Sequence, residues 1–146
     1  MSPTRVRQPA TRLMMMPRDT NPAGTIFGGV LLSYLDLAGS EEALAQGAER
    51  VVTVAMKEVI FHEPVYVGDL VSFYTELVRL GRTSITVRVL VEAARALNRA
   101  KVVRVTQAEI TYVNVDRNRH PVAIRRPLER PTGDGDGIDS TPDSDE

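Results

Sequence analysis

Cysteine is absent from the 146 residues of the chain, and histidine occurs only twice. Without cysteine the chain cannot form a disulfide, carry a thiolate nucleophile or build a zinc or iron–sulfur site with sulfur ligands. His62 and His120 stand alone in the sequence, without a histidine partner four residues away or a flanking pattern of carboxylates. Metal sites need several such ligands at fixed spacing, so we expect no bound metal.

Long apolar runs are also missing. No segment approaches the roughly 18 to 20 consecutive apolar residues of a membrane span, and residues 1–18 lack the apolar core of a secretory signal. We therefore expect a soluble, cytoplasmic protein without a membrane partner. The length and the hydrophobic fraction of 42% fit one domain with a substantial core.

Basic residues are absent from the last fourteen residues, which carry six acidic side chains. Glycine, aspartate, serine and proline dominate this tail, which cannot bury enough apolar surface to offset the entropy lost on ordering. The other 132 residues hold 18 basic and 13 acidic side chains, a net charge of +5 that suits an anionic ligand. We expect a flexible N-terminus at residues 1–12, one folded domain at 13–130 and a disordered acidic tail at 131–146.

One helix is predicted from Gly28 to about Gln46. Good helix formers follow the glycines, no proline interrupts the segment, and Gly47 offers a C-terminal stop. Apolar side chains point in most directions around its axis. We therefore expect the helix to be buried on nearly all sides.

Downstream of the helix, apolar residues alternate with polar ones, a period of two that predicts β-strands. The segments are rich in Val, Ile, Thr, Phe and Tyr: residues 50–61, 69–80, 83–94 and 101–116, with a further strand offered by residues 10–17. The breaks between the four are of hairpin or short-loop length, so we expect consecutive strands to pair antiparallel. Such a sheet buries the helix by curving around it, which predicts an α+β fold. Its edge strands need cover, and a dimer that pairs sheets edge to edge provides it.

A single carboxylate, Asp36, interrupts the apolar run of the predicted helix. A carboxylate is expensive to bury unless it is paired, hydrogen-bonded or neutral. On the helix, Gly29, Ser33, Asp36 and Ser40 fall within about 60° of one another and form a polar stripe. This stripe must face a groove, a partner or water. Taken alone, Asp36 is explained as well by a narrow solvent-facing strip or by a contact that caps a loop.

The loop before the helix adds a second feature. Residues 19–24 are rich in turn formers, and Gly28–Gly29 place bare amides at the positive end of the helix dipole. Such amides stabilise a carbonyl oxygen that gains negative charge, while a carboxylate activates water or attacks directly. The pattern favours addition of water to an acyl group. Two glycines also allow close helix packing, and no phosphate-loop or dinucleotide signature points to a cofactor.

Five motifs occur together and in order: "DTNPAGTIFGG", "SYLDLAG", "VVTVAMKEVIFHEPVYVGD", "LGRTS" and "TYVNVD". In this combination the chain resembles the hotdog-fold acyl-CoA thioesterases, in particular the bacterial and brain acyl-CoA hydrolases. The resemblance runs from about Leu13 to Ile124. One departure is the pair His62–Glu63 inside the F-x-x-P-V motif, where relatives often carry a basic or apolar residue.

The resemblance implies a hotdog fold and a dimer that assembles into a trimer of dimers. It also implies an acyl-CoA substrate, of which CoA is a part, and no separate cofactor. Asp36 matches the catalytic aspartate of the family, and Asn21 matches the asparagine that positions the thioester or water. These two would act across the dimer interface, and the amide of Gly28 or Gly29 would polarise the thioester carbonyl.

The resemblance also implies that Arg82, Thr83 and Ser84 lie near the CoA moiety, although a plain hairpin turn explains this segment nearly as well. Arg104 is a candidate for a CoA phosphate on an exposed strand position, with a solvated charged face as the alternative. Ser33 and Ser40 are predicted to bind substrate beside Asp36, where their hydroxyls can stabilise its charge. The predicted substrate- and CoA-binding residues are thus Ser33, Ser40, Arg82, Thr83, Ser84 and Arg104.

Three other functions compete with hydrolysis. A hotdog module that only binds acyl-CoA, as a sensor or regulator, usually adds a DNA-binding segment, and residues 1–18 are too short for a helix-turn-helix. We therefore expect no nucleic acid partner. A hotdog dehydratase needs a histidine beside an acid in a motif that this chain lacks. A purely structural oligomer does not explain Asp36, whose role as general base or nucleophile stays open.

Overall fold

The computed structural model describes residues 7–125, and the expected acidic tail at 131–146 lies outside this range. The elements are β1 (Thr11–Met14), the 3-10 helix η1 (Pro17–Asp19), α1 (Gly28–Ala45), β2 (Val51–Lys57), β3 (Leu70–Leu80), β4 (Ser84–Ala94) and β5 (Val102–Asn114).

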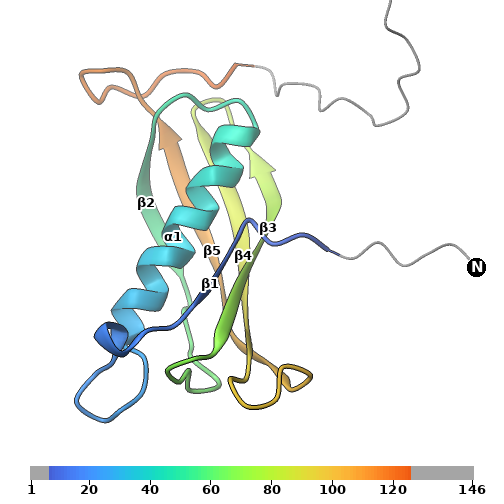
Figure 1. The fold of residues 1–146 in the computed structure, drawn as a ribbon. Helices are drawn as coiled ribbons and strands as arrows, with labels where there is room; N and C mark the ends of the chain where they lie inside the picture. Colours follow the sequence, from blue (N-terminus) through green and yellow to red (C-terminus); the bar gives the residue numbers. More distant parts are fainter. Residues whose placement is uncertain (1–6, 126–146) are drawn as a thin grey trace, which may run out of the picture.

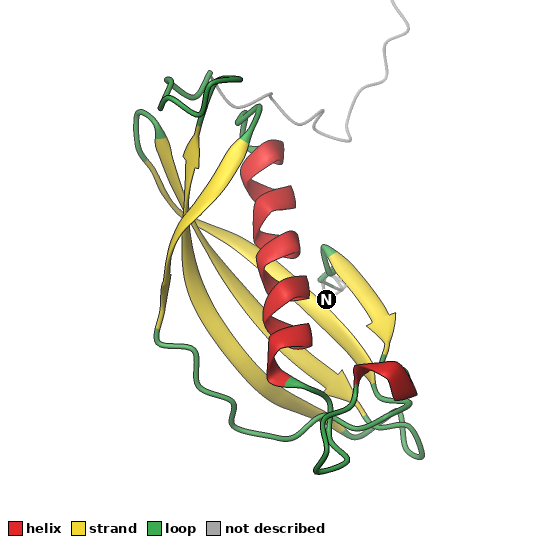
Figure 2. Cartoon of the chain, turned by 90° about the vertical axis from the view of Figure 1, so that its left-hand side faces the viewer, coloured by secondary structure: helices red, strands yellow, loops and turns green. Residues whose placement is uncertain are grey.

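The five strands form one antiparallel sheet in the order β1-β3-β4-β5-β2. The sheet curls, and α1 lies along its concave side (Figures 1 and 2). Leu31, Leu35 and Ala38 of α1 are buried against this side, and the inward residues of β4 and β5, such as Val89 and Ile110, are fully buried. The α+β architecture of a helix wrapped by a curved antiparallel sheet is confirmed.

The bounds of α1 agree with the predicted helix, and Gly47 follows it with a φ of +108°, which only glycine adopts without strain. Burial on nearly all sides is wrong for the single chain. Leu37 is 57% exposed and Leu44 is 38% exposed, because the sheet covers only one side of the helix. No helix within residues 7–125 combines the length and the apolar character needed to cross a membrane.

The expected pairing of consecutive strands holds for β3, β4 and β5 but is wrong for β2. β2 pairs with β5 at one edge of the sheet, and β3 pairs with β1 near the other. The predicted strand at 50–61 is too long, since β2 ends at Lys57 and Glu58 turns the chain with a φ of +48°. The chain between β2 and β3 therefore crosses from one edge of the sheet toward the other.

β1 begins inside the segment that we expected to be flexible. Thr11 and Arg12 pair with Phe73 and Ser72 of β3, and the Ala10 amide donates to the Phe73 carbonyl at 2.8 Å. The edge of β3 offers unpaired main-chain groups, and these residues satisfy them. The strand offered by residues 10–17 is thus present but ends at Met14.

A buried ion pair holds the end of the crossing segment. Asp69 is 1% exposed, and its Oδ2 accepts from Arg95 Nη1 at 2.7 Å and from the Tyr66 amide at 2.9 Å. Its Oδ1 accepts from the Ala96 amide at 3.1 Å. Arg95 also stacks over the Tyr66 ring, 5.1 Å from the ring centre. Both carboxylate oxygens are satisfied, so the start of β3 is fastened to the end of β4.

Asp69→Ala is expected to lower the free energy of unfolding by about 3–5 kcal/mol, because it removes the buried carboxylate from the largely buried Arg95 guanidinium and leaves Arg95, among the described residues, only the longer ion pair with Glu63 at 3.9 Å. The matched control is Glu109→Gln, which removes the half-exposed pair with Arg88 at 2.9 Å; its loss should stay below about 1 kcal/mol. Urea denaturation at one fixed protein concentration measures both, since self-association adds apparent stability. Equal losses would contradict this assignment.

Candidate functional site

Asp36 lies on the flank of α1 that faces β2, and its side chain is half-buried. The Thr53 hydroxyl of β2 donates to Asp36 Oδ1 at 2.8 Å. The Tyr112 hydroxyl of β5 is 2.7 Å from the Asp36 carbonyl oxygen and 3.1 Å from Oδ1. The carboxylate that the sequence singled out is therefore held by hydroxyls from two neighbouring strands.

The pairing of β2 with β5 places these two hydroxyls together. Thr53 and Tyr112 are register partners, so their side chains stand next to each other on the face of the sheet that carries α1. Gly39 lets the Tyr112 hydroxyl reach the helix backbone, because a Cβ at this position would collide with it. A glycine inside a helix is unfavourable by roughly 0.8–1 kcal/mol relative to alanine, and this close approach explains its presence.

Both side-chain hydrogen bonds of the Asp36 carboxylate fall on the same oxygen. Thr53 and Tyr112 each contact Oδ1, while Oδ2 accepts no hydrogen bond from the residues that the structure describes. The terminal torsion of an aspartate is broad, so two contacts on one oxygen restrict it. Oδ2 is the oxygen that remains available to a water molecule or a substrate.

The Tyr112 side chain is fully buried. Burial raises the pKa of the Tyr112 hydroxyl far above its usual value, and the negative charge of Asp36 and the hydrogen bond to it raise this pKa further. Tyr112 therefore keeps its proton and stays a hydrogen-bond donor throughout the working range of pH.

Ser33 and Ser40 lie on the exposed side of α1 together with Asp36 and Gly29, as the helical spacing predicts. Their hydroxyls do not stabilise the Asp36 charge, however. Ser33 donates to the Val30 carbonyl and Ser40 to the Leu37 carbonyl, each at 2.7 Å. A serine hydroxyl in a helix competes for the carbonyl one turn earlier, and that contact uses the proton here.

Asn21 closes its own loop. Its Oδ1 accepts from the amides of Ala23 at 2.9 Å and Thr25 at 3.2 Å, and its Nδ2 donates to the Thr25 hydroxyl at 2.9 Å. This Asx-type arrangement fixes the turn that leads into α1. No hydrogen bond joins Asn21 to Asp36 among the described residues of a single chain.

The amides of Gly28 and Gly29 stand at the first turn of α1, where helical N–H groups lack an acceptor within the helix. No hydrogen bond from either amide is found within residues 7–125. A side chain at Gly29 would collide with the Phe27 ring, 2.7 Å away. Asp36 lies eight residues further along the helix, a rise of roughly 12 Å. One chain therefore does not bring these amides and its own Asp36 to the same reacting group.

The structure places the remaining predicted residues elsewhere. The turn Arg82-Thr83-Ser84 joins β3 to β4, and its carbonyls accept from the Ile124 amide at 2.8 Å and the Asn114 amide at 2.7 Å. It therefore lies at the end of the sheet where α1 ends, away from Gly28. Arg104 borders the same hollow as Arg88, on the face of the sheet opposite to α1. A single chain brings neither to Asp36.

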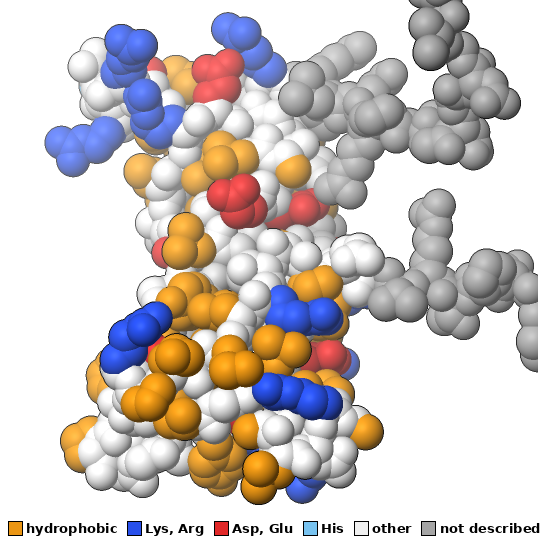
Figure 3. Space-filling view, viewed as in Figure 1, with side chains coloured by type: hydrophobic (Ala, Val, Ile, Leu, Met, Phe, Trp, Pro, Cys, Tyr) orange, Lys and Arg blue, Asp and Glu red, His pale blue; other side chains and the backbone are white. Residues whose placement is uncertain are grey.

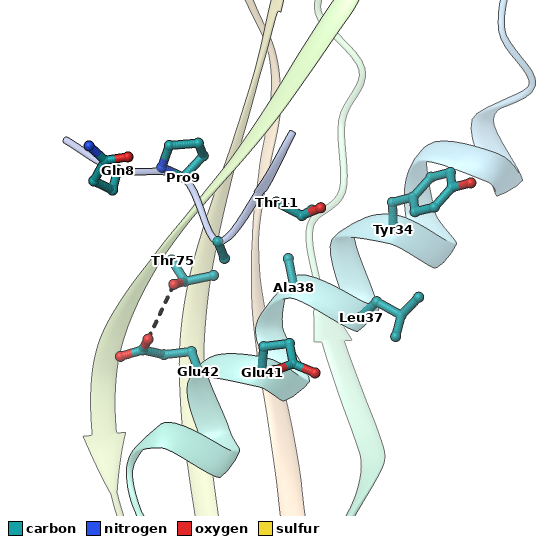
Figure 4. Close-up of a pocket in the computed structure, with 10 residues that line it drawn as sticks. Gln8, Pro9, Thr11, Tyr34, Leu37, Ala38, Glu41, Glu42 and Thr75 are labelled. Atoms are coloured by element: carbon teal, nitrogen blue, oxygen red, sulfur yellow. Dashed lines mark hydrogen bonds between the residues drawn. The ribbon is translucent and has the colours of Figure 1, made fainter. Parts of the chain in front are cut away.

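Two cavities flank the helix. One of about 570 Å³ lies between residues 8–11, β3 and the flank of α1 that carries Tyr34 and Glu41 (Figure 4). None of the predicted site residues lines it. The other, of about 260 Å³, lies at the start of α1 and includes Gly28 and Phe61.

Hydrophobic side chains gather around the start of α1. They cover much of the lower half of the face in Figure 3, where α1 begins and several loops meet. The exposed apolar residues of these segments include Phe27 at 54%, Ile60 at 59% and Phe61 at 41%. The same region carries the free amides. Within residues 7–125 no group of three or more metal-ligating side chains could hold a metal ion.

The sequence analysis did not identify three residues that surround Asp36: Thr53, Tyr112 and Gly39. Each belongs to a quoted motif, yet in the sequence Thr53 and Tyr112 read as ordinary strand residues. That Thr53 and Tyr112 flank one carboxylate follows only from the pairing of β2 with β5. The sequence predicted that β2 pairs with β3 instead. Gly39 offered a weak signal, since a glycine in the middle of a helix usually has a packing reason.

Comparison with known proteins identifies the family of the chain. The family model of the thioesterase superfamily matches residues 23–96. An uncharacterised acyl-CoA thioester hydrolase of Zymomonas mobilis is 38% identical over 118 residues, which span 80% of this chain and 78% of the relative. The acyl-CoA thioester hydrolase YciA of Escherichia coli is 36% identical over 115 residues, 77% of this chain and 87% of the relative.

Two solved structures share the fold over most of their length. A hexameric hotdog-fold thioesterase of Campylobacter jejuni superposes with a TM-score of 0.76 at 45% identity, covering 81% of this chain and 90% of that one. A hexameric broad-specificity acyl-coenzyme A thioesterase superposes with a TM-score of 0.77 at 35% identity, covering 84% of each chain.

The raised pKa of Tyr112 predicts how stability depends on pH. In the unfolded chain this hydroxyl ionises near its ordinary value of about 10. Above that value the unfolded state loses a proton that the folded state keeps, so the free energy of unfolding decreases as the pH rises. Urea denaturation on both sides of this pH measures the decrease, and Tyr112→Phe should reduce it. An unchanged slope in the variant would show that other groups cause it.

Proposed function

The chain belongs to the thioesterase superfamily and is an acyl-CoA thioester hydrolase, and from this premise we propose that Asp36 performs the hydrolysis. The observation that carries the proposal is the state of the Asp36 carboxylate. It lies half-buried beside exposed helix surface, with Oδ1 held by two hydroxyls and Oδ2 open. A fixed carboxylate with one free oxygen suits a base or a nucleophile.

Two routes lead to the same products. As a general base, Asp36 takes a proton from water while the water oxygen adds to the thioester carbonyl, and the carbon–sulfur bond then breaks. The proton passes to the departing CoA thiolate, which leaves a fatty acid and CoA. As a nucleophile, Asp36 first forms a mixed anhydride with release of CoA, and water then hydrolyses the anhydride. Oxygen-18 from water enters the Asp36 carboxylate only by the second route, and only when water attacks the aspartyl carbonyl of the anhydride; attack on the acyl carbonyl places the label in the fatty acid.

We place the carbonyl oxygen of the thioester at the start of α1, where the free amides of Gly28 and Gly29 stabilise its developing charge. Because these amides lie roughly 12 Å from Asp36 of the same chain, one thioester cannot reach both. When the twofold axis is perpendicular to α1, the two copies of the helix run antiparallel, so the amides and Asn21 of one copy can approach Asp36 of the other. The proposed site is therefore shared between two protomers.

β2 is the surface that we propose for this pairing. It is an edge strand, and Val52 and Val54 are 37% and 55% exposed on it. An unpaired edge with apolar side chains is a template for another strand. Thr53 lies between these two valines, so the interface would include the residue that contacts Asp36. The hexameric relatives support assembly of three such dimers.

In the oligomer, the turn Arg82-Thr83-Ser84 comes from the end of the sheet where α1 ends. In an antiparallel pair this end lies toward the partner's helix start, which supports a place for the turn near the CoA moiety of the partner's substrate. The net charge of +5 outside the tail favours approach of the CoA phosphates.

Asp36→Asn is expected to reduce kcat for acyl-CoA hydrolysis by on the order of 10²- to 10⁴-fold. The reason is that a side-chain amide is too weak a base to accept a proton from water and too weak a nucleophile to attack a carbonyl. Thiol release from acyl-CoAs of graded chain length measures this reduction. The matched control is Glu41→Gln, the same change at an exposed position of the same helix, which should keep parental kcat.

Two results would contradict the proposal. An Asp36→Asn protein with parental kcat would remove Asp36 from the chemistry. A parent that binds acyl-CoA but releases no thiol from any member of the series would favour a binding module, in which the loop at residues 19–29 serves only as a ligand cradle.

Val54→Lys is expected to weaken the dimer and to lower activity in proportion to dissociation, because it places a charge on each β2 edge where the two strands meet. Sedimentation velocity and thiol release, measured over the same range of protein concentration, test this link. Leu97→Lys is the control, since Leu97 is fully exposed in the loop between β4 and β5. A Val54→Lys monomer with full activity would show that one chain carries a complete site.

A further inference from the structure

We propose that Tyr112 is a positioning residue for hydrolysis, which holds the Asp36 carboxylate with Oδ2 toward the substrate. The proposal rests on the function proposed for Asp36. Tyr112 itself is fully buried beneath α1 and cannot touch a substrate. Its hydroxyl acts through Asp36, which it contacts at the main-chain carbonyl oxygen and at Oδ1.

The position of the hydroxyl explains how it acts. It lies 2.7 Å from the Asp36 carbonyl oxygen and 3.1 Å from Oδ1, so one proton serves a main-chain and a side-chain acceptor of the same residue. Contact with both fixes the side chain relative to the helix backbone. Thr53 reaches the same Oδ1 from β2 at 2.8 Å. With two donors on Oδ1, rotation of the carboxylate would break both contacts.

The Tyr112 hydroxyl is itself fixed in place. The ring is enclosed by the core, and the hydroxyl fits against α1 only because Gly39 has no side chain. A methyl group on Gly39 would collide with the hydroxyl and would stand 3.1 and 3.2 Å from two ring carbons. Most of that clash is with the oxygen. The pair Gly39–Tyr112 therefore sets where the proton is presented to Asp36.

A neutral donor is needed for this task, and Tyr112 remains one. Burial and the nearby Asp36 charge raise the pKa of its hydroxyl, so it does not become an anion that would repel the carboxylate. A core that needed only volume here could use phenylalanine, which fills the same space without a polar atom to satisfy.

Tyr112→Phe is the first test, because it removes one oxygen and keeps the ring. With the carboxylate less restricted, kcat should fall roughly 10- to 100-fold, the range expected for a hydrogen bond to a charged group, while KM changes by less than about twofold. Tyr74→Phe is the matched control. Tyr74 lies on β3, where its ring contacts Arg7, and its hydroxyl has no part in the Asp36 environment.

Gly39→Ala is the second test, and it keeps Tyr112. The added methyl group displaces the hydroxyl, so kcat should fall and stability should decrease. In the double variant Gly39→Ala/Tyr112→Phe the main clash disappears, so part of the lost stability should return while kcat stays low. A recovery of stability without a recovery of kcat indicates that the Tyr112 hydroxyl positions Asp36. If Tyr112 only packed the core, the double variant would recover both stability and kcat.

The outcomes distinguish this proposal from the function on which it rests. If Tyr112→Phe keeps kcat within about twofold of the parent, in an assay where Asp36→Asn is inactive, Tyr112 only packs the core and the proposal is wrong. A raised KM at unchanged kcat would also overturn it. If Asp36→Asn itself keeps parental activity, the proposed function fails first and this proposal fails with it.

Discussion

A helix with apolar side chains around most of its circumference lies on a sheet that covers only one of its sides. Leu35 and Ala38 face the sheet and are buried, whereas Leu37 stays 57% exposed on the same helix. A single chain cannot bury all the apolar side chains of this helix, because its sheet covers only one side. Burial of the other side needs surface from another protein chain. Asp36 lies half-buried at the border of the uncovered side, next to β2, which is an edge strand of the sheet. The proposed pairing of two protomers along β2 would add surface beside this helix and bring a second copy to Asp36.

The path of the chain after β2 determines what Asp36 meets. Had β2 paired with β3, as the short breaks predicted, Thr53 would not be the register partner of Tyr112. Instead the segment after Lys57 crosses the sheet, tied down by the His62 amide on the Val105 carbonyl at 2.8 Å and by the Thr106 hydroxyl on the Ile60 carbonyl at 2.6 Å. The buried Asp69 then fastens its far end. This crossing leaves β2 at the edge, beside β5, where both hydroxyls reach one carboxylate.

The sequence predicted those features that depend on local spacing. The helix from Gly28, the stop at Gly47 and the stripe around Asp36 follow from periodicity and from backbone preferences, which act over a few residues. The neighbour of β2 and the roles of Thr53 and Tyr112 depend on contacts between residues far apart in the chain, which a pattern of alternation does not encode. Ser33 and Ser40 were placed correctly, but their hydroxyls bond to the helix, a choice that spacing leaves open.

A comparison of two aspartates of the chain supports the role proposed for Asp36. Asp69 is 1% exposed, both of its oxygens accept hydrogen bonds, and Arg95 balances its charge. Asp36 has no cationic partner within residues 7–125, and its hydrogen bonds leave Oδ2 open. Natural proteins satisfy buried polar groups nearly completely, and Asp69 follows that rule. Asp36 is only half-buried, held at one oxygen and open at the other, and this state supports its proposed role of taking a proton from water or attacking a thioester.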